Sequence, residues 1–83
     1  MNYDEQVKYW FPARAALVRY RGGSPWDASR ELGEMLGTGY SHPNYFKYIT
    51  LTPRHRRILE QLAGPHGEAV YKAFRAQRAK EQG

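Results

Sequence analysis

Residues 32–49 read LGEMLGTGYSHPNYFKYI, and the interpretation of this stretch decides the fold. Three apolar side chains recur at the spacing of one helix face, and a glycine then marks a typical helix end. These residues are Leu32, Met35 and Leu36, followed by Gly37. Residues 38–40 are typical of a turn, and Ser41, His42 and Pro43 predict a second short helix that runs to about Ile49. The stretch is therefore either a helix-turn-helix unit or two neighbouring helices of an ordinary bundle.

The sequence before this stretch predicts two helices. Residues 3–21 have helical spacing, and Pro12 predicts a kink or a break because proline lacks the backbone donor. The glycines at 22 and 23 end this helix. The next helix starts after either Ser24 or Asp27, since both residue types cap helix N-termini.

The sequence after this stretch predicts two more helices. Thr52 followed by Pro53 indicates a helix over 53–63, and a last helix covers 68–80. The side chains expected to face the core in these helices and in 3–21 are Val7, Trp10, Phe11, Leu17, Val18, Ile58, Leu59, Leu62, Val70, Ala73 and Phe74. We expect an all-α fold, a small bundle of four to five short helices containing a helix-turn-helix-like unit. It forms a single domain over 1–83, with a frayed tail at about 80–83.

The composition is that of a folded chain. It has 83 residues, 41% of them hydrophobic and 25% charged, and no cysteine, so the core depends on apolar packing. No apolar run approaches the ~20 residues that a membrane span needs, and the N-terminus lacks the apolar region of a signal peptide. We therefore expect a cytoplasmic protein with no membrane partner.

The net charge of +5 is distributed unevenly. Basic and acidic residues balance within 1–40, whereas 41–83 holds eight basic residues and three acidic ones. The whole positive excess therefore lies in the second half. A basic half favours a polyanionic partner such as nucleic acid, because neutralising phosphates releases counterions.

The stretch at 32–49 resembles the helix-turn-helix of small DNA-binding regulators. Leu32 and Leu36 match the buried apolar pair of that motif, Gly33 matches the small residue at the helix crossing, and Gly37 matches the turn glycine. The turn from Gly37 to Ser41 is about two residues longer than in that family. Residues 13–64 also resemble ParB-type partition proteins, with 51–53 as the Leu-Thr-Pro start of a supporting helix. The resemblance implies a duplex-DNA-binding regulator or partition-type module that acts as a homodimer.

The residue types fit that function. The side chains expected to contact DNA bases from helix 42–49 are Ser41, His42, Asn44 and Lys47, because amide, imidazole and hydroxyl groups match base edges. The expected phosphate contacts are Arg30, Arg54, Arg56, Arg57, Arg75 and Arg78. Four of these arginines, at 54, 57, 75 and 78, are expected on one basic face of the helical hairpin 53–80.

Two other functions remain open. A phage-encoded inhibitor of a host protein complex, of the anti-defence type, would use exposed aromatic anchors, for which the candidates are Trp10, Phe11, Trp26 and Tyr40. An RNA-binding or virion-assembly protein would stack exposed tyrosines on unpaired bases. A purely structural role is also open, because the aromatic residues of 40–48 can supply core volume.

Motifs for catalysis, cofactors or metals do not stand out in the sequence. The three histidines lack the spacing that places metal ligands on one helix face. Glu31 and Glu34 share a helix face, which we interpret as a solvated surface rather than a catalytic carboxylate pair. We expect no enzyme, no cofactor and no metal site.

Overall fold

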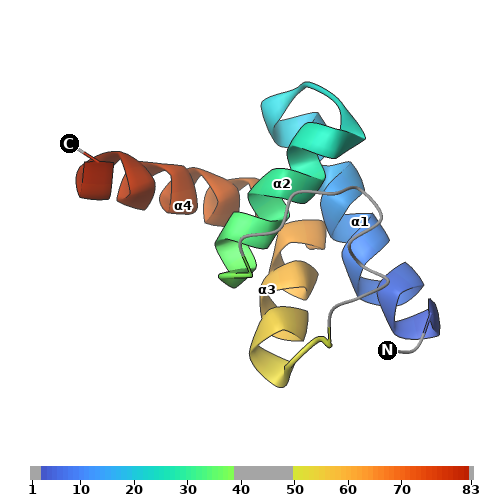
Figure 1. Cartoon of the computed structure of the whole chain (residues 1–83). Helices are drawn as coiled ribbons and strands as arrows, with labels where there is room; N and C mark the ends of the chain where they lie inside the picture. The colour runs from blue at the N-terminus through green and yellow to red at the C-terminus, as the bar shows by residue number, and fades with distance from the viewer. Residues whose placement is uncertain (1–2, 39–49, 83) are drawn as a thin grey trace.

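The computed structural model describes residues 3–38 and 50–82, which form four helices (Figure 1). Their bounds are α1 Tyr3–Arg21, α2 Pro25–Leu36, α3 Pro53–Ala63 and α4 Gly67–Gln82. No strand occurs within these two ranges, so the predicted all-α bundle is confirmed. The predicted helix over 41–49, and with it the second half of the helix-turn-helix-like unit, lies outside the described residues.

Helix α1 is the central element, because α2, α3 and the start of α4 all pack against it. It continues through Pro12, so the predicted break does not occur. Proline removes one backbone hydrogen bond, but Trp10 and Ala13 on either side are fully buried. Packing in the core therefore holds both halves in one helix, while Pro12 itself lies on the exposed side.

Helix α2 is capped at both ends by its own sequence. Ser24 Oγ accepts a hydrogen bond from the Asp27 amide at 3.2 Å, and Asp27 Oδ2 accepts one from the Ser24 amide at 3.0 Å. The two predicted starts are thus two halves of one capping box. At the other end Gly37 adopts φ 78°, and the Thr38 amide donates to the Gly33 carbonyl at 2.9 Å. This left-handed ending confirms that Gly37 ends the helix.

The hairpin of α3 and α4 depends on a close backbone approach at Gly67. A Cβ atom at this buried position would lie 1.9 Å from the Leu62 carbonyl oxygen. That same oxygen accepts a 2.9 Å hydrogen bond from the Tyr20 hydroxyl of α1. Glycine at 67 therefore lets the end of α3, the start of α4 and α1 meet at one point.

The core is formed by one face of each helix. Its fully buried larger side chains are Trp10, Leu17, Leu32, Leu59 and Leu62. Val7 and Ala73 were expected in this core, and both are exposed. In α4 the side that faces the bundle carries Gly67 and Tyr71, which lie one turn apart and are both buried. Ala73 points away from the bundle. Val7 lies beside the Trp10 face of α1 rather than on it.

The C-terminal half of α4 makes little apolar contact. Residues 75–82 include no buried side chain, and Figure 1 shows this part of the helix extending beyond the other three. None of the described helices combines the length and apolar character that crossing a membrane requires.

Candidate functional site

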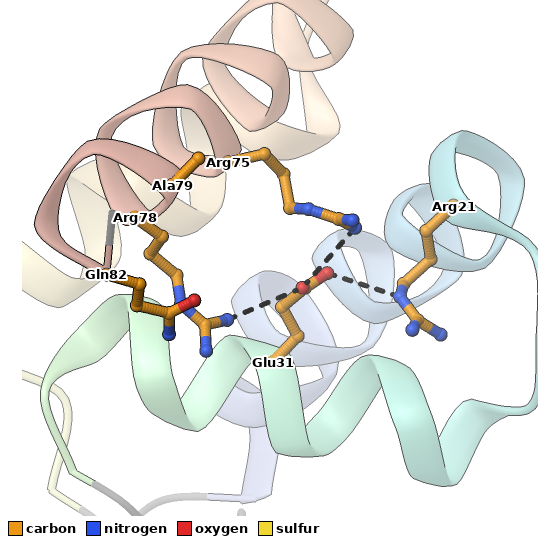
Figure 2. A pocket seen from close by; sticks show the side chains of 6 residues that line it. All are labelled: Arg21, Glu31, Arg75, Arg78, Ala79 and Gln82. Carbon is orange, nitrogen blue, oxygen red and sulfur yellow. Dashed lines mark ion pairs between the residues drawn. The ribbon is translucent and has the colours of Figure 1, made fainter.

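A buried carboxylate between α2 and α4 organises the polar interior of the fold (Figure 2). The Glu31 side chain is only 9% exposed, and it forms ion pairs with arginines from two other helices. Arg21 Nε of α1 lies 3.2 Å from one carboxylate oxygen. Arg75 and Arg78 Nη1 of α4 lie 3.8 and 3.9 Å from the other. Glu31 thus connects the end of α1 and the distal half of α4 to α2.

Tyr71 of α4 joins this cluster through Arg75. Its hydroxyl accepts a 2.7 Å hydrogen bond from Arg75 Nη1. Burial raises the pKa of Tyr71 above its ordinary value of 10.0, and the nearby Glu31 carboxylate raises it further, while Arg75 opposes the shift. The phenol therefore remains neutral around physiological pH and serves as a hydrogen-bonding group beside a buried charge.

The position of Glu31 corrects the prediction of a solvated carboxylate face. Glu34 is exposed and pairs with Arg78, as a surface residue can, but Glu31 is buried. The reason is tertiary, because α4 brings two arginines over the middle of α2, where Arg21 already approaches. One signal was present in the sequence, since Glu31 follows Ala28 by three residues on the apolar stripe of α2. Arg21 and Tyr71 are members of the cluster that sequence reasoning did not find.

The six arginines predicted to contact phosphate fall into two groups. Four of them pair with acidic side chains of this chain: Arg30 with Asp27, Arg56 with Glu5, Arg75 with Glu31, and Arg78 with Glu31 and Glu34. An internal partner neutralises part of the charge that phosphate would need. The single basic face expected for the hairpin is therefore wrong, since Arg75 and Arg78 face α2.

Arg54 and Arg57 form the second group. Both side chains are exposed, and neither forms an ion pair with any residue of 3–38 or 50–82. They lie three residues apart in the first turns of α3, so they project from one side of the helix. This first turn contains no acidic residue. The start of α3 therefore presents, beside the positive end of a helix dipole, two cations that have no acidic partner in 3–38 or 50–82.

This basic start of α3 follows the segment expected to read bases. Leu51 is buried and Thr52 caps α3, accepting a 3.1 Å hydrogen bond from the His55 amide. The chain is thus anchored immediately after 41–49. The predicted base-contacting residues Ser41, His42, Asn44 and Lys47 all lie outside the described residues.

Helix α2 has the features expected of the first helix of a helix-turn-helix. Leu32 and Leu36 are buried, Gly33 is buried between them, and Gly37 turns the chain. Any capped helix that ends in glycine can share these features, and the second half of the predicted unit lies outside the described residues, so the helix-turn-helix stays a prediction.

The four predicted protein-interface aromatics have different surroundings. Trp10 is fully buried in the core and is wrong as a surface anchor, because its ring fills the centre of the bundle. Phe11 is half-buried, and Trp26 is 44% exposed. Tyr40 lies outside the described residues.

Residues that would hold a metal are not grouped in the described part of the chain, where no three His, Cys, Asp or Glu side chains cluster. Comparison of the chain with models of protein families, with curated proteins and with solved structures gives no match.

Proposed function

We propose that this chain is a small helical protein that binds duplex DNA as a transcriptional regulator or partition-type module. Segment 42–49 would lie in the major groove, and the start of α3 would rest on the flanking phosphates. The observation that carries the proposal is the pair Arg54 and Arg57, exposed and without an acidic partner among the described residues, directly after that segment.

The internal ion pairs indicate which arginines are available to contact phosphate. A cation that is already paired with a carboxylate contributes less free energy of binding to a phosphate, because the internal ion pair must first be broken. Arg54 and Arg57 carry no such cost. They therefore supply phosphate contacts that set the register of the protein on DNA, while base recognition is left to Asn44 and its neighbours.

A homodimer is part of the proposal, because helix-turn-helix proteins commonly read two half-sites about one helical turn apart. A single copy with two or three phosphate contacts would bind weakly at physiological salt. Two copies on a palindromic site double both the contacts and the length of sequence that is read.

The test is a selection of bound duplexes from a random pool at low salt, followed by salt titrations on the enriched duplex. Removing both cations in Arg54→Gln/Arg57→Gln should weaken all duplexes and lower the salt slope by about 2, since each phosphate contributes about 0.9. The control for net charge is Lys72→Gln/Lys80→Gln, which removes two exposed cations from α4, of which Lys72 pairs with Glu68. The control should retain wild-type affinity and slope.

A second variant tests the reading segment. Asn44→Ala/Lys47→Ala should abolish the preference for the enriched sequence, because it removes two of the four expected base contacts. Absence of duplex binding at low salt would refute the proposal. An equal loss in the Lys72→Gln/Lys80→Gln control would refute the role given to the start of α3, because it would reduce binding to net charge.

A further inference from the structure

A groove runs along the outer side of α1 beside the start of α2. Its apolar lining consists of Phe11, Ala15 and Val18 of α1 and Pro25 of α2, and its volume is about 560 Å³. None of these side chains is fully buried by the fold. Phe11 and Val18 pack against the core on one side and line the groove on the other, so the apolar face of α1 extends to the surface here.

Two more exposed apolar side chains adjoin groove residues in the chain, although they do not line the groove. Val7 lies one turn before Phe11, and Trp26 follows Pro25 in the chain. They are 42% and 44% exposed, and within the described ranges they are the large hydrophobic residues most exposed to solvent. Scattered exposed apolar residues need no explanation, but a continuous apolar groove indicates an interaction site.

The edges of the groove are positively charged. Arg14 and Arg19 belong to its lining, and Lys8 lies exposed on the same helix, one turn before the groove residues. The Arg14 guanidinium lies over the Phe11 ring, 5.0 Å from its centre, which keeps the charge beside the apolar floor. Among the residues that line the groove there is no acid.

From this combination we propose that the groove binds an amphipathic helix of a partner protein whose apolar stripe is flanked by aspartate or glutamate. The apolar stripe would contact Phe11, Ala15 and Val18, and the acidic flanks would pair with Arg14 and Arg19. Helix-in-groove binding of this kind obtains its affinity from the apolar anchors and its specificity from the flanking charges.

The charge of the groove also decides against a second copy of this chain as the occupant. Two copies meeting through this face would bring the Arg14 and Arg19 side chains of one against those of the other, and like charges in contact are unfavourable. A concave groove fits a convex helix better than the flat surface of an anionic membrane. The site lies on α1 and α2, so it is independent of the cations on α3 that the proposed DNA binding uses.

The test uses a designed peptide of about 18 residues, which makes five helical turns. Leucines occupy one face, glutamates flank them, and alanines fill the rest. Its binding to the full chain is measured by fluorescence anisotropy of a dye on the peptide. Emission of Trp26 provides a second measurement, because covering this half-exposed indole should shift its emission to shorter wavelength, whereas Trp10 is already buried. A peptide with lysine in place of each glutamate is the probe for charge.

The groove is altered by Ala15→Glu, which places an acid at its centre. The matched control is Ala76→Glu, the same change at an exposed alanine of α4. We expect Ala15→Glu to weaken binding of the glutamate peptide by about tenfold or more, and Ala76→Glu to change it by less than about twofold. Arg19→Gln should weaken binding about threefold and reduce its salt dependence. Circular dichroism checks folding, and Arg19→Gln serves alone if Ala15→Glu does not fold.

Three results would overturn the proposal. The first is equal or tighter binding of the lysine peptide, which would remove the role of Arg14 and Arg19. The second is that the chain binds vesicles containing anionic lipid but not the peptide, and that Ala15→Glu abolishes the binding to vesicles. This result would make the groove a membrane-binding face. The third is a dimer in sedimentation that Ala15→Glu dissociates, which would make the groove an interface between copies of this chain. Loss of DNA binding in Arg54→Gln/Arg57→Gln with unchanged peptide binding would keep the two sites separate.

Discussion

Replacing Glu31 by glutamine tests how much one buried carboxylate, paired at the shortest distance with Arg21 of α1, stabilises the fold. Glutamine keeps the size and shape of the side chain but removes the charge that faces Arg21, Arg75 and Arg78. A hydrogen-bonded or closely paired charged group is worth about 1.5–3 kcal/mol when buried, and an exposed pair about 0.2–1 kcal/mol. The Arg21 contact at 3.2 Å involves side chains that are 22% and 9% exposed, so solvent screens it little, but neither Nε nor Oε1 is hydrogen-bonded to any described residue, and its contribution therefore lies between the two classes.

The contacts of Glu31 with α4 contribute less. Their separations are 3.8 and 3.9 Å, and the Arg75 and Arg78 side chains are 55% and 35% exposed, so solvent screens them. Together the three contacts lead us to expect that Glu31→Gln lowers the free energy of unfolding by about 2 kcal/mol. With a urea dependence of about 1 kcal/mol per molar for a small domain, the midpoint should fall by about 2 M.

The measurement is urea unfolding followed by circular dichroism, with Glu68→Gln as the control. Glu68 is 59% exposed and pairs with Lys72 at i,i+4, so its removal should cost less than about 0.5 kcal/mol. A double-mutant cycle with Arg21→Gln should show that most of the loss is shared by the two residues. Equal midpoints for Glu31→Gln and the wild type would refute the reasoning, as would losses for Glu31→Gln and Arg21→Gln that simply add.

Three further predictions follow from single contacts. Gly67→Ala should destabilise the fold by about 2 kcal/mol or more, because the added methyl meets the Leu62 carbonyl oxygen. In the control Gly22→Ala the methyl meets no atom within 4 Å, so this change costs only the strain of the positive φ. Thermal unfolding compares the two variants, and equal losses of stability would contradict the role given to Gly67. Ser24→Ala should cost about 1 kcal/mol by removing the α2 cap, measured by urea unfolding, and a loss restored by Ser24→Asp would identify capping as the cause. Because the folded-state pKa of Tyr71 is raised above 10.0, its contribution to stability is present below pH 10.0 and is lost as pH rises through the folded pKa. Tyr71→Phe should therefore flatten the decline of stability at alkaline pH. An unchanged decline would show that the ionisation of Tyr71 does not cause it.

Local sequence signals predicted the helices well, because those signals act through the backbone of neighbouring residues. Ser24 and Thr52 cap α2 and α3 as expected, and the left-handed Gly37 ends α2. A kink or a break at Pro12 was predicted from the same kind of local rule, and the break does not occur, since burial of Trp10 and Ala13 outweighs one lost hydrogen bond. A local preference fails where packing supplies more free energy than the preference itself.

The site was harder to predict than the helices. Arg54 and Arg57 are exposed as expected, but Arg56, Arg75 and Arg78 pair with acids that are between 44 and 51 residues away in the chain. The sequence alone cannot distinguish a cation that faces solvent from one that faces a distant carboxylate. The base-contacting residues of 41–47 remain predictions.

The sequence by itself determined which segments are helical, where most of them begin and end, and that the positive charge is concentrated after residue 40. These properties depend on spacing and capping within a few residues. Only the tertiary structure decided that Glu31 is buried among arginines, that Trp10 is core, and that Phe11 and Val18 line an open groove. The physical reason is that burial and ion pairing depend on which helix faces meet, and this is decided by long-range packing such as the contact of Gly67 with the end of α3.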